Sequence, residues 1–204
     1  MTDVLKLGFL ASHNGSSMRA IVAAAQSGEL PAIPCVLISN NADAPALAYA
    51  RKVGVPAHHL SRSKLGDGTD LDRAIAETLA AAGAEWLILS GYLRKLGPRT
   101  LARHAGRILN IHPSLLPKFG GPGMYGLNVH KAVIAAGERV SGATVHLVDE
   151  QYDHGPVLAR REVAVEPGET PQCLARRIQE IEPALFLDVL HRLAEGSLVL
   201  PTGT

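Results

Sequence analysis

This chain of 204 residues has few cysteines and almost no net charge. Its two cysteines, Cys35 and Cys173, lie far apart and outside any C-x-x-C motif. Such a pair argues against a disulfide framework or a thiolate metal site and fits a reducing compartment. The 20 Lys and Arg residues nearly balance the 19 Asp and Glu residues, so no field suited to a phosphate backbone is expected. Nucleic acid is therefore not the expected partner.

Long apolar runs are missing as well, and no signal peptide is expected. No apolar run approaches the length of a membrane span, and the residues after Met1 form no basic segment followed by an apolar stretch. We therefore expect a cytoplasmic protein that does not contact a membrane. The nine histidines form no H-x-x-x-H or H-E-x-x-H pattern, so no metal site is expected.

Short apolar runs alternate with helical patterns through the first half of the chain. Strands are predicted over 5–11, 34–39, 56–60, 86–89 and 108–111, and helices over 18–28, 44–53, 70–82 and 98–105. This alternation is typical of right-handed crossovers and a doubly wound, mostly parallel Rossmann-like sheet with helices on both faces. With 47% hydrophobic residues, the chain can bury a full core as a single domain.

The pattern changes after Pro117. A glycine-rich loop over 120–123 precedes a short helix over 129–136 and two strands over 142–148 and 157–165, which we expect to pair as an antiparallel extension of the sheet. Thr170 and Pro171 then form an N-cap and N1 pair that opens a long final helix, and Gly196 ends it.

Asn110 and His112 stand two residues apart at the end of a predicted strand. Alternation along a strand directs both side chains to the same face, where a fixed amide N–H and a titratable imidazole suit chemistry at a carbonyl. Pro113 and Pro117 cannot extend a central ladder, so the strand should stop at the histidine. In parallel sheets, ligands bind at that carboxyl edge.

A polar turn with a glycine, Ser12 to Ser17, joins the first strand to the first helix. Free backbone N–H groups, the positive helix end and the Ser16 and Ser17 hydroxyls would suit a phosphate. The turn is neither G-x-G-x-x-G nor a P-loop, which disfavours a dinucleotide or a nucleoside triphosphate. The alternative is that Ser16 or Ser17 only caps the helix.

A second polar segment, Asp149 to Pro156, lies between the two late strands. Asp153, just before Gly155-Pro156, could place its carboxylate over the sheet edge and orient His112. The alternative is an ordinary Asx-type turn without a catalytic role.

Four motifs together resemble the glycinamide ribonucleotide transformylases of the folate-dependent formyltransferase family. They are Ser12-His13-Asn14-Gly15-Ser16-Ser17, Leu89-Ser90-Gly91-Tyr92-Leu93-Arg94, Leu109-Asn110-Ile111-His112-Pro113-Ser114-Leu115-Leu116-Pro117 and Tyr152-Asp153-His154-Gly155-Pro156. The resemblance runs from Leu5 to about Leu190. It implies a single formyltransferase domain over 1–204, with a substrate-phosphate half over 1–117 and a folate-binding half over 118–204.

The resemblance also implies a role for each matching residue. Asn110, His112 and Asp153 match the catalytic trio; Gly15, Ser16, Ser17 and Glu182 match the contacts to glycinamide ribonucleotide; and Leu93, Arg94, Lys95, Leu96, Asn110, Asp149, Glu150, Gln151, Tyr152 and Asp153 match the stretches that bind 10-formyltetrahydrofolate. The implied reaction moves the formyl group from this folate to the substrate amine, in purine biosynthesis, without a metal, in a monomer or a homodimer.

The chain departs from the family pattern at two places. The loop over 120–130 is longer than the usual P-G-x-H-x-H loop and leaves one family histidine without a counterpart. Pro183 stands where the family often has His. Other readings stay open. They are a formyltetrahydrofolate deformylase, a methionyl-tRNA formyltransferase, a sugar-nucleotide formyltransferase, a non-catalytic folate or phosphate binder, and a dinucleotide binder.

Overall fold

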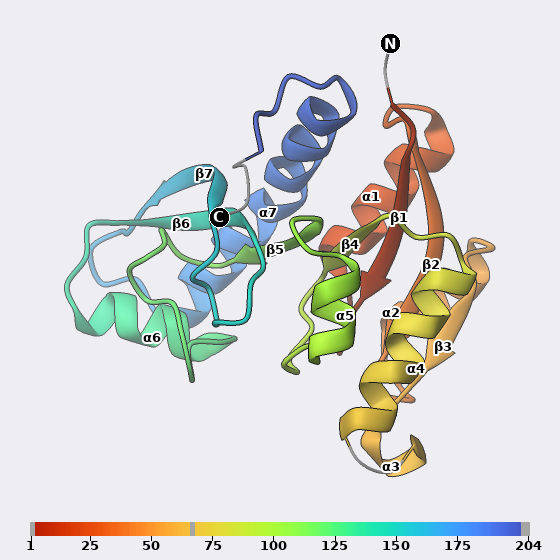
Figure 1. Ribbon diagram of the computed structural model, residues 1–204. Coiled ribbons are helices and arrows are strands. Elements are labelled where there is room, and N and C mark those ends of the chain that lie inside the picture. The colour runs from red at the N-terminus through yellow and green to blue at the C-terminus, as the bar shows by residue number, and fades with distance from the viewer. Residues whose placement is uncertain (1–2, 66–67, 201–204) are drawn as a thin grey trace.

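Seven strands form one sheet in the computed structural model, which describes residues 3–65 and 68–200 (Figure 1). The strands are β1 (Leu5–Leu10), β2 (Ala32–Ser39), β3 (Ala57–His59), β4 (Trp86–Leu89), β5 (Ile108–His112), β6 (Val140–Leu147) and β7 (Val157–Ala164). Their order across the sheet is β3-β2-β1-β4-β5-β6-β7. The first five are parallel, whereas β6 and β7 pair antiparallel to their neighbours.

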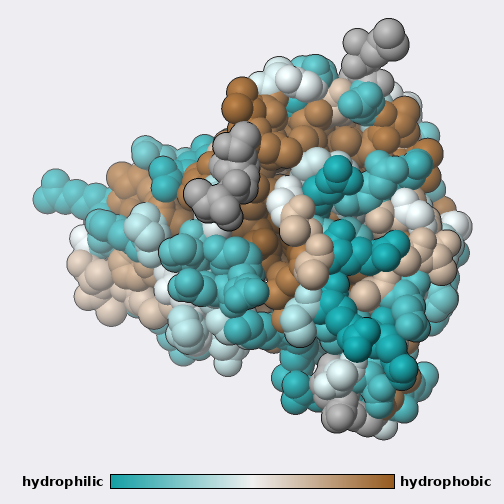
Figure 2. Space-filling model, in the orientation of Figure 1, coloured by the Kyte–Doolittle hydropathy of each residue, from teal (hydrophilic) through white to brown (hydrophobic). Residues whose placement is uncertain are grey.

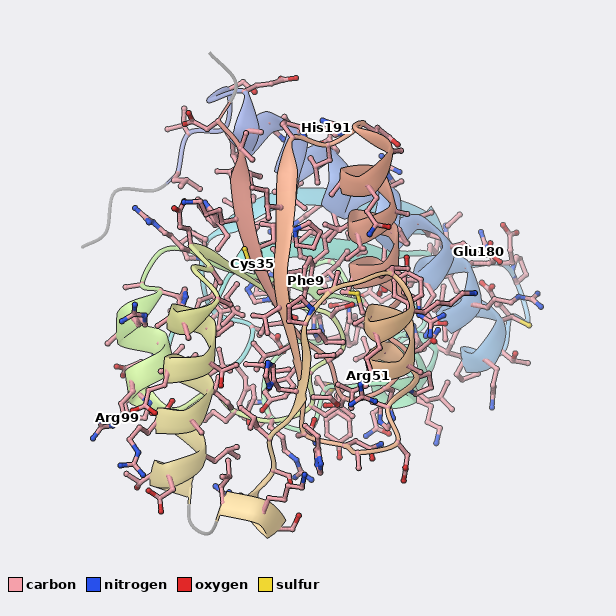
Figure 3. The ribbon with its side chains drawn as sticks, turned by 90° about the vertical axis from the view of Figure 1, so that its right-hand side faces the viewer. Phe9, Cys35, Arg51, Arg99, Glu180 and His191 are labelled. Carbon is pink, nitrogen blue, oxygen red and sulfur yellow. The ribbon has the colours of Figure 1, made fainter. Side chains whose placement is uncertain are left out.

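Helices cover both faces of this sheet. They are α1 (Ser16–Ser27), α2 (Pro45–Lys52), α3 (Arg62–Leu65), α4 (Gly68–Ala81), α5 (Pro98–Arg103), α6 (Leu127–Ala135) and α7 (Pro171–Ala194). The first, second, sixth and seventh pack on one face, and α4 and α5 pack on the other. Figure 3 shows the labelled Phe9 between these layers, with Arg51 and Arg99 on the outside.

The strands at the centre of the sheet are apolar because helices bury them from both sides. All four residues of β4, Trp-Leu-Ile-Leu, are buried, and Leu87 and Ile88 belong to the two different core clusters. Burying one such side chain contributes about 1.5 to 3 kcal/mol. The edge strand β7 instead exposes three successive polar residues, Arg160, Arg161 and Glu162.

The predicted fold class is confirmed, and nearly every predicted helix and strand is present. Boundaries differ by a few residues: α1 begins at Ser16 rather than Met18, and β2 begins at Ala32 rather than Pro34. The strand β5 ends at His112, as the following proline requires. The helix α3 was not predicted, because four residues are too few to show a helical period.

The strand order reverses between β1 and β4. Strands β2 and β3 follow β1 in one direction across the sheet, and β4 and β5 lie in the other. Loops that leave adjacent strands in opposite directions open a crevice at their carboxyl ends, which is where doubly wound folds bind ligands. The turn after β1, the loop after β4 and the end of β5 meet at this point.

The surface is mixed in polarity. Figure 2 shows hydrophilic residues over the part of the molecule where α3 and α4 lie, and hydrophobic residues toward the end where β1 and β2 begin. Val4 and Ile33 are half exposed at that end. Within residues 3–65 and 68–200, none of the helices combines the length and the apolar character needed to cross a bilayer.

Candidate active site

A cavity of about 510 Å³ opens at the carboxyl edge of the sheet, beside the switch point. Its volume is that of a small-molecule site. Every residue predicted for the site lines it: Gly15, Ser16, Ser17, Leu93, Arg94, Lys95, Leu96, Asn110, His112, Asp149, Glu150, Gln151, Tyr152, Asp153 and Glu182. Segments from both halves of the chain therefore meet in one place.

The end of β5 directs Asn110 and His112 into this cavity. His112 is buried, with 4% of its surface exposed, and its Nε2 lies 2.8 Å from the carbonyl oxygen of Phe119. A carbonyl oxygen accepts only, so this nitrogen carries a proton. Phe119 has a φ of 57°, in the left-handed region that few non-glycine residues adopt, and this turn brings its carbonyl back to the histidine.

The carboxylate of Asp153 approaches the other side of the same imidazole. Its Oδ2 lies 3.4 Å from His112 Nδ1 and accepts a hydrogen bond of 2.9 Å from the N–H of Gly121. Both ring nitrogens of His112 thus face oxygen acceptors, which the doubly protonated ring satisfies. Asp153 also has a left-handed φ, 55°, so the backbone at both partners of the histidine is held in an uncommon conformation.

Opposing effects act on the pKa of Asp153. Burial raises this pKa, but the hydrogen bond and positive charge of His112 and the N–H of Gly121 together outweigh it and lower the pKa. The carboxylate is therefore ionised at neutral pH. The Asx-type turn that was the alternative for Asp153 is made by Asp149 instead, whose Oδ1 accepts from the N–H of Gln151 at 2.7 Å.

The turn after β1 leaves two backbone donors at the start of α1. Gly15 is the N-cap, with a φ of 63°, and no side chain caps this helix end, so neither serine acts as its cap. The N–H of Met18 donates to Ser90 Oγ at 3.0 Å. Among the described residues, the N–H groups of Ser16 and Ser17 make no hydrogen bond to protein, and they line the cavity at the positive end of the helix.

Ser12 joins the three loops that follow β1, β2 and β4. Its hydroxyl donates to Asn40 Oδ1 at 2.6 Å and accepts from the N–H of Leu93 at 2.8 Å. Beyond Leu93, the ammonium of Lys95 lies 5.9 Å from the centre of the Tyr152 ring, so the two stretches predicted to bind folate contact each other. Leu93 and Tyr152 are both about half exposed toward the cavity mouth.

Glu182 reaches the cavity from the middle of α7. Only 9% of its surface is exposed, and burial raises its pKa to about 7, although the positive charge of His112 acts against the rise. Gln179, one turn earlier, lines the cavity too. Pro183 follows within the helix and has no N–H to donate to the carbonyl of Gln179.

The cavity is also lined by residues to which the sequence analysis assigned no role, among them Ser90, Tyr125 and His146. Tyr125 lies in the long loop before α6 and is 58% exposed. A polar residue directly after β4 and another within β6 were usable signals for Ser90 and His146. Within the described part of the chain, no three His, Cys, Asp or Glu side chains are grouped so as to hold a metal ion.

A doubly wound sheet with a polar cavity at its carboxyl edge places the chain among the α/β proteins whose ligand sites lie at that edge. The family model described as formyl transferase matches residues 5–190. The chain belongs to this family.

Named relatives agree with this assignment. The chain is 38% identical to the chloroplastic phosphoribosylglycinamide formyltransferase of Vigna unguiculata, over 95% of the chain and 62% of that protein. It is 34% identical to the phosphoribosylglycinamide formyltransferase of Haemophilus influenzae, over 96% and 90%. The crystal structure of glycinamide ribonucleotide transformylase 1 from Symbiobacterium toebii superimposes with a TM-score of 0.90 at 36% identity, over 97% and 91%. The chain thus spans less than two thirds of the plant relative's length.

Proposed function

We propose that this chain transfers the formyl group of 10-formyltetrahydrofolate to the amine of glycinamide ribonucleotide, giving formylglycinamide ribonucleotide and tetrahydrofolate. One observation carries the proposal: the His112 and Asp153 pair, with Asn110, shares a cavity with the free N–H groups of Ser16 and Ser17. Relatives that are named for this reaction support the choice of substrates.

The substrate phosphate would bind at the start of α1, where Gly15 lets the backbone turn and Ser16 and Ser17 donate. Glu182, across the cavity, would accept a hydrogen bond from the ribonucleotide. The folate would occupy the stretch from Leu93 to Leu96 and the loop from Asp149 to Asp153. The phosphate would thus bind within the expected phosphate half, 1–117, whereas the folate would contact both that half, through Leu93 to Leu96, and the expected folate half, 118–204, through the loop from Asp149 to Asp153.

In the proposed reaction, the substrate amine attacks the formyl carbon and forms a C–N bond, and the carbonyl oxygen becomes an oxyanion. The amide N–H of Asn110 and the positive charge of His112 would stabilise this oxyanion. The bond between the formyl carbon and the folate nitrogen then breaks. The amine loses a proton and the leaving nitrogen gains one, with the ionised Asp153 assisting the transfer through a bound water. No metal is part of this proposal.

The test is an absorbance assay of tetrahydrofolate formation with glycinamide ribonucleotide present or omitted. Product that forms only with the acceptor supports the transferase. Equal rates without the acceptor would instead identify a deformylase. Formylation of an amino sugar nucleotide in place of the ribonucleotide would overturn the choice of acceptor while leaving the chemistry of the trio in place.

A further inference from the structure

His146 is a buried titratable group at the cavity that the proposed reaction does not use. It lies on β6 directly opposite Asn110 in the strand register, and only 1% of its surface is exposed. It nevertheless lines the cavity. A histidine in this position must find partners for both ring nitrogens inside the protein.

The two contacts of His146 define its tautomer. Its Nδ1 lies 2.8 Å from the carbonyl oxygen of Leu147, which can only accept, so Nδ1 carries the proton. Its Nε2 lies 3.1 Å from Nδ2 of Asn110, an amide nitrogen that can only donate, so Nε2 presents its lone pair. The two bonds require the neutral ring with the proton on Nδ1. Burial, opposed by the Leu147 hydrogen bond and by Asp153, lowers the pKa of His146 and favours this neutral form.

The groups around His146 do not offer Nε2 a better partner than Asn110. The carboxylate oxygen Oδ1 of Asp153 is 3.7 Å from Nε2, beyond hydrogen-bond reach. The positive charge of His112 and the negative charge of Asp149 act on the ring without a hydrogen bond to it. The lone pair of Nε2 is therefore directed to the Asn110 amide.

Because the Leu147 carbonyl holds the proton of the neutral ring on Nδ1, Nε2 is an acceptor, and this sets which way the carboxamide of Asn110 points. A rotation by 180° would place its oxygen against the Nε2 lone pair, two acceptors facing each other. In the observed orientation, one N–H of the amide is held by His146. The second N–H is the donor that remains for a ligand in the cavity.

We propose that His146 is a positioning residue, which holds the carboxamide of Asn110 as a fixed hydrogen-bond donor for the oxyanion of the reacting formyl group. The inference rests on the proposed formyl transfer. It gives a neutral histidine a role in orienting the catalytic amide and requires no contact between His146 and the formyl group.

Two substitutions separate this role from simple packing. In His146→Gln the side-chain oxygen reaches the position of Nε2 and can accept from Asn110. In His146→Asn the shorter amide can keep the bond to Leu147 but leaves Asn110 without its acceptor. We expect His146→Asn to lower kcat by about 10²-fold, as for loss of one oxyanion donor, with both KM values within about twofold. His146→Gln should recover most of that loss.

A double-mutant cycle with Asn110→Ala then tests whether His146 acts through Asn110. The double variant Asn110→Ala, His146→Asn should be no slower than Asn110→Ala alone, because the group that His146 positions is already missing. The proposal would be overturned if the fold loss of kcat in the double variant equalled the product of the two single losses. Equal losses of kcat in His146→Gln and His146→Asn would overturn it as well.

Nitrogen NMR of ¹⁵N-histidine-labelled wild-type protein near neutral pH tests the tautomer directly and needs neither activity nor folded variants. The expected spectrum shows His146 neutral and protonated at Nδ1. An imidazolium, or a ring protonated at Nε2, would refute the positioning role. A wild-type chain that shows this tautomer but transfers no formyl group would refute the proposed function instead.

Discussion

The buried carboxyl of Glu182 should make the stability of this protein depend on pH in the neutral range. Its folded-state pKa of about 7 lies above the ordinary value of 4.5. Between these values the folded chain holds the proton more tightly than the unfolded chain does. The group therefore costs little stability below pH 4.5, and the cost grows as pH rises toward 7 and is complete above it.

The size of this effect follows from the shift. At about 1.4 kcal/mol per pKa unit, the rise to about 7 amounts to about 3 kcal/mol above pH 7 and to less than about 1 kcal/mol at pH 5. Glu182→Gln removes the titration while keeping the length of the side chain. The stability advantage of the variant is its free energy of unfolding minus that of the wild type. This advantage should be larger at pH 8 than at pH 5 by about 2 to 3 kcal/mol.

Urea unfolding at pH 5 and pH 8 measures this difference, and any constant cost of burying the amide cancels between the two values. Glu180→Gln is the matched control, because Glu180 is exposed on the same helix. That variant should differ from the wild type by the same amount at both pH values. A Glu182→Gln variant whose advantage does not grow with pH would refute the reasoning.

Three further outcomes are expected. Asp153→Asn keeps the shape but removes the charge beside His112, so kcat should fall by about 10²-fold or more while KM changes far less; steady-state kinetics with near-wild-type turnover would contradict this. Ser16→Ala and Ser17→Ala should chiefly raise KM for glycinamide ribonucleotide, and an unchanged KM would count against the phosphate turn. The carboxylate of Asp72 accepts hydrogen bonds from the first N–H groups of α5 at 2.8 and 3.1 Å. Asp72→Ala should therefore lower the free energy of unfolding by about 1 to 2 kcal/mol without a change in KM. An unchanged melting temperature would show that this cap contributes nothing.

The sequence predicted the fold well because apolar periodicity reports which faces are buried. The end of β5 at His112 followed from Pro113 alone. The partners of the site residues were harder to foresee. The bond between Asn110 and His146 depends on the register of β5 against β6, and no pattern in either strand specifies that register. The carbonyl of Phe119 reaches His112 only because the loop adopts a left-handed turn there, at a residue type that rarely does so.

The reversal of strand direction after β5 has a practical consequence for engineering. The parallel strands end at His112, and Asp153 comes from the antiparallel hairpin, so a cut in the loop between Gly123 and Met124 would place the two charges on separate fragments. Each fragment holds whole helices and strands, and the two meet where β5 pairs with β6 and where α1 packs on α7. Recovery of activity on mixing would then report the joining of the two pieces, which makes this sheet a candidate scaffold for a split reporter.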